Sequence, residues 1–243
     1  MEKIKRSFVD EQIRLALEAL GRSQVLPKWA RWTPKMWQEA VRRGMDPSEI
    51  INCGLGWDFT TFGVSERMFP KTGLVAFTLS NGNPDKEYPQ EYCQKLLWLQ
   101  EGQSIPWHHH KDKREDIYHI AGGRLRMQVA RPKRIREKFE ADKTENLILS
   151  LENAPREFVP CGEFWVGKEC PRRIRLEPGI GHLMTGGCGG TLLGEVSSVN
   201  KEVGVRVQDN TFWAGNPRYI NIVADVPPRY VLCNEYAELL KVA

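Results

Sequence analysis

The stretch Gly102–Gly122, GQSIPWHHHKDKREDIYHIAG, constrains the fold more than any other, because it holds four of the five histidines in the chain. His108 and His110 are two residues apart, so on a β-strand both side chains point to the same side. Glu115 follows after four residues, and the remaining histidine, His182, lies elsewhere in the chain. Two imidazoles and a carboxylate can converge on a metal ion from adjacent strands, so the sequence predicts a metal centre here.

The spacing of this stretch resembles the first motif of the cupin superfamily: a glycine, five residues, His-x-His, four residues, a glutamate, six residues and a glycine. Pro178, Gly179 and His182 are similar to the second cupin motif, although here the proline directly precedes the glycine. The resemblance implies a mainly β fold, an antiparallel, jelly-roll-like β-barrel that holds one divalent metal ion. It also implies the four ligands, which are His108, His110, Glu115 and His182.

The other two histidines of the stretch are read from strand alternation. His109 alternates away from its neighbours, so we expect it to face outward with a structural role. His119 has the same parity as Glu115 and is expected to point into the barrel. We interpret it as a pocket wall or substrate contact and not as a fifth ligand.

Length and charge exclude some functions. The chain has 243 residues, 41% of them hydrophobic, which fits one large domain or one domain with a substantial appendage. Its net charge is +4, and acidic residues interleave with the basic runs Lys111–Arg114 and Arg131–Lys138. No base-stacking platform accompanies these runs, so a nucleic-acid partner is not expected.

The sequence gives no sign of export or membrane insertion. The first twenty residues carry charges throughout, so a signal peptide is not expected. No run approaches the roughly 18 apolar residues of a membrane-spanning helix, so no membrane partner is expected. The six cysteines contain no CxxC pair and are expected to be reduced, which predicts a cytoplasmic location.

The character of the chain changes near residue 53. Residues 1–52 predict a helical cover that packs on the barrel, with Thr33 as a cap and Pro34 at the first helical position. Residues 53–243 contain strand-like runs divided by Gly, Asn and Pro, and predict the cupin barrel domain. The mixed, charged residues near 131–160 separate the two motifs and predict an inserted hairpin or excursion.

Lys95 lies on an otherwise apolar stripe of a predicted strand, together with Leu97 and Leu99. Such a lysine either snorkels at a sheet edge or is a charge held inside a substrate pocket. These two interpretations are open at the level of sequence.

Three imidazoles and one carboxylate without a thiolate suit Mn, Fe, Co, Ni or Zn. Octahedral coordination leaves two adjacent positions, which can accept the carbonyl and α-hydroxyl oxygens of a sugar. Chelation of that pair acidifies the C–H group between them, as aldose–ketose isomerisation requires. The same positions can hold O₂ beside a substrate, so the four ligands alone do not separate an isomerase from an oxygenase.

A closer resemblance is carried by the block PWHHHKDKREDI together with GLGWD, GEVSSVN and VLCNEY. These motifs run from Gly54 to Tyr236 and are similar to the D-lyxose isomerase family of cupins. The resemblance implies a metal-dependent sugar isomerase, usually with manganese. It implies action on D-lyxose and D-xylulose, and often on D-mannose and D-fructose.

The same resemblance suggests roles for two cations. Lys113, in the KRED match, corresponds to the family's catalytic lysine, and its charge would lie near the substrate oxygens. The alternative is a solvated loop lysine. Arg218 lies in a C-terminal segment that also resembles the family and can bind sugar hydroxyls or pair with an acid on the surface.

The chain departs from the family pattern at the catalytic base. In the family, the segment corresponding to Phe212–Arg218 carries an acid, whereas here it has no carboxylate. Glu195 is the first substitute, because its strand follows His182 and its parity can direct it into the barrel. Asp209 is the second choice, and the alternative for Glu195 is a barrel acid satisfied by hydrogen bonds.

The sequence therefore predicts a metal-dependent aldose–ketose isomerase that acts on a small sugar through a cis-enediol. Two other interpretations stay open: an iron cupin dioxygenase and a non-catalytic sugar-binding cupin that kept the metal. A homodimer is expected, because a barrel with exposed edges commonly pairs.

Overall fold

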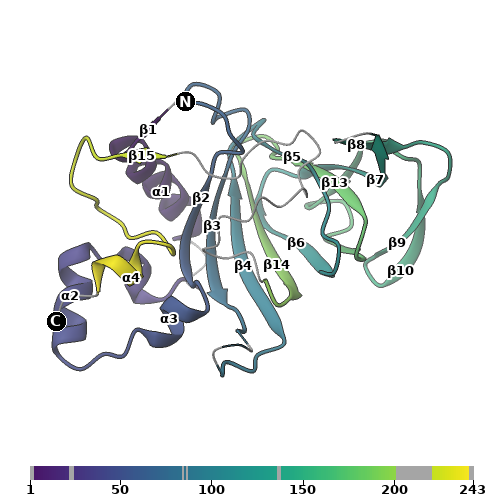
Figure 1. Ribbon diagram of the computed structural model, residues 1–243. Coiled ribbons are helices and arrows are strands. Elements are labelled where there is room, and N and C mark those ends of the chain that lie inside the picture. Colours follow the sequence, from purple (N-terminus) through teal and green to yellow (C-terminus); the bar gives the residue numbers. More distant parts are fainter. Residues whose placement is uncertain are drawn as a thin grey trace.

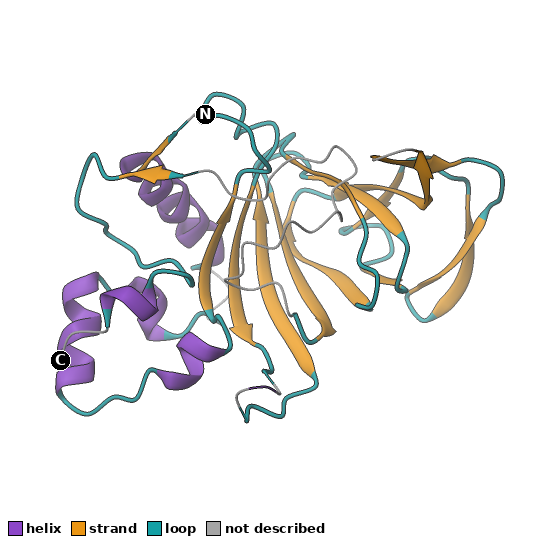
Figure 2. Ribbon diagram, in the orientation of Figure 1, coloured by secondary structure: helices purple, strands orange, loops and turns teal. Residues whose placement is uncertain are grey.

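Two curved antiparallel sheets form the body of the molecule in the computed structural model, which describes residues 3–21, 25–83, 85, 87–135, 138–200 and 221–240. Helices gather on one side of the sheets, and a strand-rich excursion extends from the other side (Figures 1 and 2). Both sheets contribute side chains to one apolar core, so they form an open barrel. This confirms the predicted mainly β, cupin-like fold with an N-terminal helical cover.

The larger sheet has eight strands among the described residues, and non-consecutive strands are neighbours in it. In spatial order the strands are β10 (Ala154–Phe158), β9 (Leu147–Leu151), β12 (Arg173–Leu176), β6 (Glu115–Gly122), β14 (Thr191–Ser198), β4 (Tyr92–Leu99), β3 (Leu74–Ser80) and β2 (Gly56–Thr60). Such crossovers bring distant segments together, as where Glu195 on β14 pairs with Lys95 on β4 and Ile117 on β6.

The smaller sheet carries His108 and His182. Its strands are β11 (Phe164–Val166), β7 (Leu125–Ile135), β13 (Gly181–Thr185) and β5 (Ser104–His108), and β8 (Lys138–Asp142) also pairs with β7. β13 and β5 are antiparallel neighbours, with His182 opposite His108. A separate parallel pair joins β1 (Ile4–Lys5) to β15 (Ile222–Val223).

The N-terminal segment is helical, as the capping signals predict. It contains α1 (Arg6–Leu20), the 3₁₀ turn η1 (Lys28–Arg31), α2 (Pro34–Arg42) and α3 (Ser48–Asn52), and α4 (Tyr236–Leu239) joins them from the C-terminal end. At the start of α2, the backbone N–H of Met36 donates to the Thr33 hydroxyl at 3.4 Å, and Pro34 has no N–H to leave unpaired. The division of the chain at residue 52 stays a prediction.

Alternation along the strands of the large sheet separates two cores. On the outer face, side chains such as Trp57, Phe77 and Leu96 pack with α1. On the inner face, residues such as Leu97 and Leu193 pack against the smaller sheet. Because successive residues point to opposite faces, each strand serves both cores.

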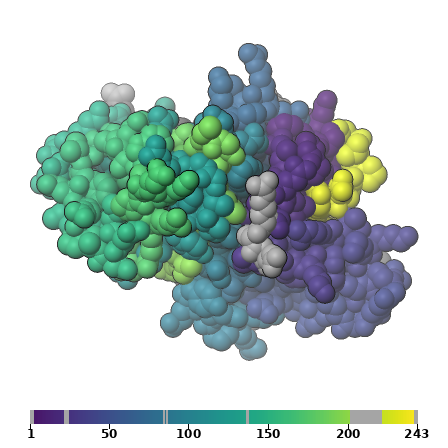
Figure 3. Space-filling view, turned by 180° about the vertical axis from the view of Figure 1, so that it is seen from behind, coloured from purple at the N-terminus to yellow at the C-terminus, as the bar shows by residue number. Residues whose placement is uncertain are grey.

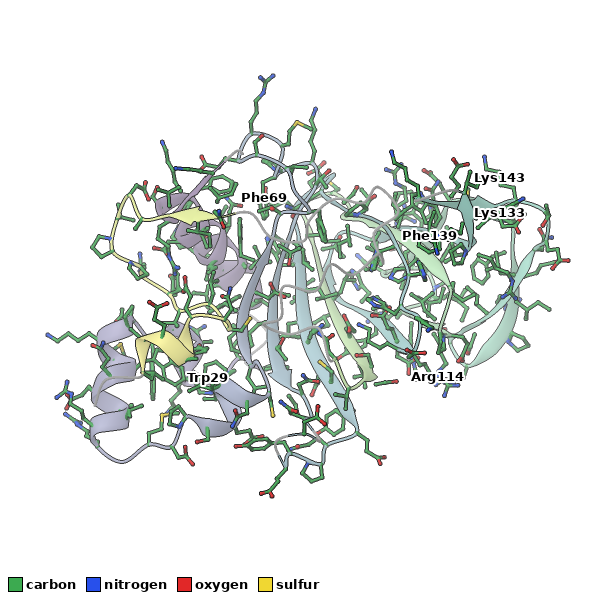
Figure 4. The ribbon with its side chains drawn as sticks, viewed as in Figure 1. Trp29, Phe69, Arg114, Lys133, Phe139 and Lys143 are labelled. Carbon is green, nitrogen blue, oxygen red and sulfur yellow. The ribbon has the colours of Figure 1, made fainter. Side chains whose placement is uncertain are left out.

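Residues 131–160, which we expected to form an insertion, extend both sheets. β7 and β8 form one hairpin, and β9 and β10 form a second hairpin at the edge of the large sheet. This part lies at the far end of the molecule from the N-terminal helices when seen from behind (Figure 3). Figure 4 likewise shows Phe139 and Lys133 at one end and Trp29 at the other.

Two further expectations concern membranes and thiols. None of the helices in the described ranges is long and apolar enough to cross a bilayer. All six cysteines are free thiols, and Cys53, Cys93 and Cys233 are buried.

Candidate metal centre and substrate cavity

Three histidines meet between the two sheets. His108 ends β5, His110 follows it in the loop, and His182 lies beside His108 on β13. One ring nitrogen from each lies within 4.8 Å of the others. The ring centroids of His108 and His182 are 4.0 Å apart, and those of His108 and His110 are 5.2 Å apart. The two-residue spacing predicted this proximity for His108 and His110, and the sheet pairing adds His182.

Backbone carbonyls orient two of these rings. Nδ1 of His108 lies 2.8 Å from the Pro106 carbonyl oxygen, and Nδ1 of His182 lies 3.2 Å from that of Ile180. In each case Nδ1–H donates to the carbonyl, which places the ring lone pair on Nε2. A metal-binding histidine commonly has its second nitrogen fixed in this way.

Glu115 completes the group from the large sheet. It is the first residue of β6 and is buried, with 3% of its surface exposed. Its Oε1 lies 3.4 Å from His110 Nε2, and its Oε2 lies 3.5 Å from His182 Nε2. The four predicted ligands are therefore brought together by β5, β6, β13 and the loop after β5.

The electrostatics of this group suit a cation. Burial, followed by the neighbouring His182 and His110, lowers the pKa of His108 well below its usual value. Burial likewise lowers the pKa of His182 to about 4, against the opposing effect of Glu115. Burial alone would raise the pKa of Glu115, but His110 and Lys113 hold it well below its usual range. Burial therefore favours neutral imidazoles at His108 and His182, and the Glu115 carboxyl is ionised; these are the forms that bind metals.

One buried atom supports this fit directly. Nε2 of His182 makes no hydrogen bond within the described part of the chain, although the residue is almost fully buried. Leaving a buried polar atom unpaired costs about 1–3 kcal/mol, and a metal ion at this point would remove the cost. Three imidazole nitrogens and one carboxylate suit the divalent transition metals from Mn to Zn.

A second charged group adjoins the first. Nζ of Lys113 lies 2.6 Å from Glu115 Oε1 and 3.1 Å from Glu195 Oε1. Lys95 Nζ lies 3.8 Å from the same oxygen of Glu195. The side chains of Lys113, Glu195 and Lys95 are mostly buried. Lys95 is therefore a charge inside the pocket and not a lysine that snorkels at an edge.

The lysines set the protonation state of Glu195. Burial would raise the pKa of this carboxyl, but Lys113 and then Lys95 outweigh burial and lower it. Glu195 is therefore an ionised carboxylate that can accept a proton. Glu115, Glu195 and both lysines line one cavity with His108 and His110.

Two other residues considered from the sequence, His119 and His109, lie away from the cavity wall. His119 is buried on β6, but its Nε2 contacts the Gly123 carbonyl at 3.1 Å and its ring is not part of the cavity wall. The His109 ring packs on Phe139 of β8 at 4.7 Å between centroids. Asp209 and Arg218 lie outside the described residues.

The cavity also contains two residues that the sequence reasoning missed. Asp58 and Thr60 of β2 line it on the side of the sheet edge. A signal was present, because Asp58 is the one charged residue in the strand GWDFT, where a buried acid needs a reason.

The chain is similar to known proteins along nearly its whole length. Residues 4–236 match the D-lyxose isomerase family. The chain belongs to the D-lyxose isomerase family. Two proteins named D-lyxose/D-mannose isomerase are similar along nearly their whole length. That of Serratia proteamaculans is 32% identical over 98% of this chain and 100% of its own, and that of Escherichia coli O157:H7 is 31% identical over 97% and 99%.

The fold of this family member has solved counterparts. The L-ribose isomerase of Cellulomonas parahominis, solved with L-ribose, matches with a TM-score of 0.54. The alignment covers 91% of this chain and 99% of the other, at 16% identity, so it supports the shared fold alone. Membership of the D-lyxose isomerase family makes the chain an isomerase, and the family resemblance seen in the motifs is confirmed.

Proposed function

We propose that this chain is a metal-dependent aldose–ketose isomerase that interconverts D-lyxose and D-xylulose and also acts on D-mannose and D-fructose. The observation that carries the proposal is one cavity in which a His108–His110–His182 group adjoins a Lys113–Glu195–Lys95 group. The first group can hold a cation, and the second pairs a carboxylate base with two positive charges. The names of the relatives support sugars as substrates.

The metal would be held by His108, His110, His182 and Glu115, with manganese as our first choice and Co, Ni, Fe or Zn as alternatives. When bound, it would polarise the carbonyl and the adjacent hydroxyl of the sugar and acidify the C–H group between them. The remaining tasks fall to side chains of this chain.

Glu195 is our candidate for the base. Its carboxylate accepts the C2 proton of the aldose, which gives a cis-enediol, and then delivers the proton to C1. A second proton passes from O2 to O1, so the ketose forms with no net gain or loss of atoms or electrons. Lys113 and Lys95 are ammonium groups that cannot accept the proton, but they can stabilise negative charge that develops on the sugar oxygens. Asp209 is the second candidate base and Arg218 is a proposed substrate contact, whereas His119, which the sequence suggested for the same role, is not part of the cavity wall.

The decisive experiment is incubation of Mn-loaded protein with each of the four sugars, followed by chromatography of the products. We expect D-lyxose to give D-xylulose and D-mannose to give D-fructose, and the reverse. Oxygen uptake by the iron form without sugar interconversion would instead identify a dioxygenase. Saturable sugar binding without turnover would identify a binding protein. Sedimentation of the same sample tests the proposed homodimer.

A further inference from the structure

The inner face of β2 is polar where the rest of the strand is apolar. Trp57 and Phe59 point outward into the core shared with α1, whereas Asp58 and Thr60 point to the opposite face. Asp58 is 6% exposed and Thr60 is 1% exposed. Both side chains line the cavity that also contains Glu195 and the proposed metal ligands His108 and His110.

The position of Asp58 relates it to the proposed catalytic groups. Across the large sheet, the strands β6, β14, β4, β3 and β2 follow one another, and they carry Glu115, Glu195, Lys95, Ala76 and Asp58 on the inner face. Asp58 therefore lies three strand spacings from Glu195 and two residues along the strand, on the order of 16 Å at the backbone. All these side chains line the same cavity as His108 and His110, so Asp58 and the proposed metal ligands share one cavity wall.

Ala76 neighbours Asp58 on this side of the cavity. It pairs with Asp58 on one side and with Leu97 on the other. Its methyl group is the smallest side chain in the row Asp58–Ala76–Leu97, and it lines the cavity next to Asp58.

Asp58 and Thr60 are coupled to each other. The Thr60 hydroxyl donates to Asp58 Oδ1 at 3.1 Å. An ionised carboxylate offers about four acceptor positions, so it can accept hydroxyl protons in addition to its contacts within the protein. A pair of this kind on a cavity wall is suited to bind hydroxyl groups of a polyol.

We infer that Asp58, positioned by Thr60, binds the hydroxyl of the sugar at the end remote from the metal. This inference rests on the proposed isomerase function and adds a specificity site to it. The sugar would extend from the histidines toward β2, with the proton transfer at Glu195 and Lys113 near one end and Asp58 at the other. Asp58 would then determine which sugars are accepted, and leave the proton transfer to Glu195.

The test compares D-lyxose with 5-deoxy-D-lyxose, which lacks the terminal hydroxyl. For the wild-type enzyme we expect kcat/KM to be about 10–100-fold lower with the deoxy sugar, because a hydrogen bond to a charged group is lost. In Asp58→Asn, kcat/KM for D-lyxose should fall about 10–100-fold, mainly through KM, while the value for the deoxy sugar should change less than about threefold. The preference for the terminal hydroxyl should therefore disappear.

Two further variants complete the design. Thr60→Val should reduce the preference about threefold or more, since it removes the hydrogen bond that the Thr60 hydroxyl donates to Asp58. Thr61→Val is the matched control: its hydroxyl is buried on the other face, has no hydrogen bond within the described residues and does not line the cavity. It should keep the wild-type preference. Manganese content should be unchanged in all three variants, by elemental analysis.

The outcomes separate this inference from the proposed function. An Asp58→Asn enzyme that loses activity equally on both sugars, or keeps the wild-type preference, overturns the inference while the isomerase function stands. If Asp58→Asn does not fold, an unchanged preference in Thr60→Val overturns it. If the wild-type protein isomerises no sugar, the proposed function fails. Calorimetric binding of D-lyxose over the deoxy sugar, lost in Asp58→Asn, would then still support the subsite, and equal or absent binding would overturn it.

Discussion

The two faces of the large sheet are built from the same strands but differ in chemistry. The outer face packs aromatic and aliphatic side chains against the helical cover. Phe77, for example, contacts Trp29 of η1 and Trp57 of the neighbouring strand β2 at ring-centroid distances of 5.0 and 4.8 Å. The inner face buries charges, among them Lys95 and Glu195. Apolar burial on the outer face is favourable, whereas each buried charge costs free energy that its partners must offset. We infer that the outer face stabilises the sheet and that the inner face carries function.

The largest effect is expected when a proposed metal ligand is removed, which tests whether the inner side carries function without contributing much to stability. His182→Ala should lose manganese and reduce activity by about a hundredfold or more, because even the residues that only orient a metal ligand are typically worth about 10–100-fold. The thermal midpoint of the metal-free protein should change little. Elemental analysis, activity and thermal unfolding with and without added manganese measure the three quantities.

The matched control for that variant is His119→Ala, which removes a buried histidine outside the cavity wall and should keep its metal. Full metal retention in His182→Ala would show that the second cupin-like motif does not contribute a ligand.

The second test is Glu195→Gln, which removes the proposed base and keeps the shape of the side chain. It should keep the metal and lose about 10²–10⁴-fold in kcat, the usual contribution of a general base. Wild-type turnover in D₂O should place solvent deuterium in the product. A wild-type rate in Glu195→Gln would show that Glu195 is not the base and would leave Asp209 as the candidate. Absence of label in a wild-type reaction that depends on Glu195 would indicate a shielded base that returns the same proton.

The third test addresses the outer face. Phe77→Ala removes a fully buried ring and should lower the free energy of unfolding by about 3–5 kcal/mol. Urea unfolding monitored by circular dichroism measures this change. The folded variant should bind manganese with wild-type stoichiometry, since Phe77 faces away from the cavity. A loss of metal without loss of stability would contradict the division between the faces.

The smallest expected effect is at a helix start far from the cavity. Thr33→Ala should lower the free energy of unfolding by about 0.5–1 kcal/mol, because Thr33 caps α2 through a long hydrogen bond of 3.4 Å. Thr33→Ser keeps the hydroxyl and serves as the control. Both variants should keep wild-type kcat and KM, and a change in either would show that the helical cover contributes to the site.

Several features of the site could be predicted from local periodicity. The His-x-His spacing predicted that His108 and His110 lie together, and strand parity predicted that Glu195 faces inward. Parity also predicted that His119 faces inward, but parity gives no distance along the strand, and His119 lies four positions after Glu115. At that position the His119 ring contacts the Gly123 carbonyl and does not line the cavity.

Other features needed the complete fold. Lys113 lies in the loop after β5, where no period applies, and only the approach of β6 and β14 brings it to Glu115 and Glu195. Asp58 was not predicted because its place in the cavity depends on a sheet order in which β2 follows β3 and β4.

The sequence by itself determined the class of fold and the donor set, because spacing and side-chain type are local properties that a strand converts directly into direction. Only the tertiary structure decided which charges meet. The pairing of β14 between β4 and β6 places Glu195 beside Lys95 and Lys113, although these residues are far apart along the chain. Contact between distant strands depends on the register of the whole sheet, and no local pattern contains that register.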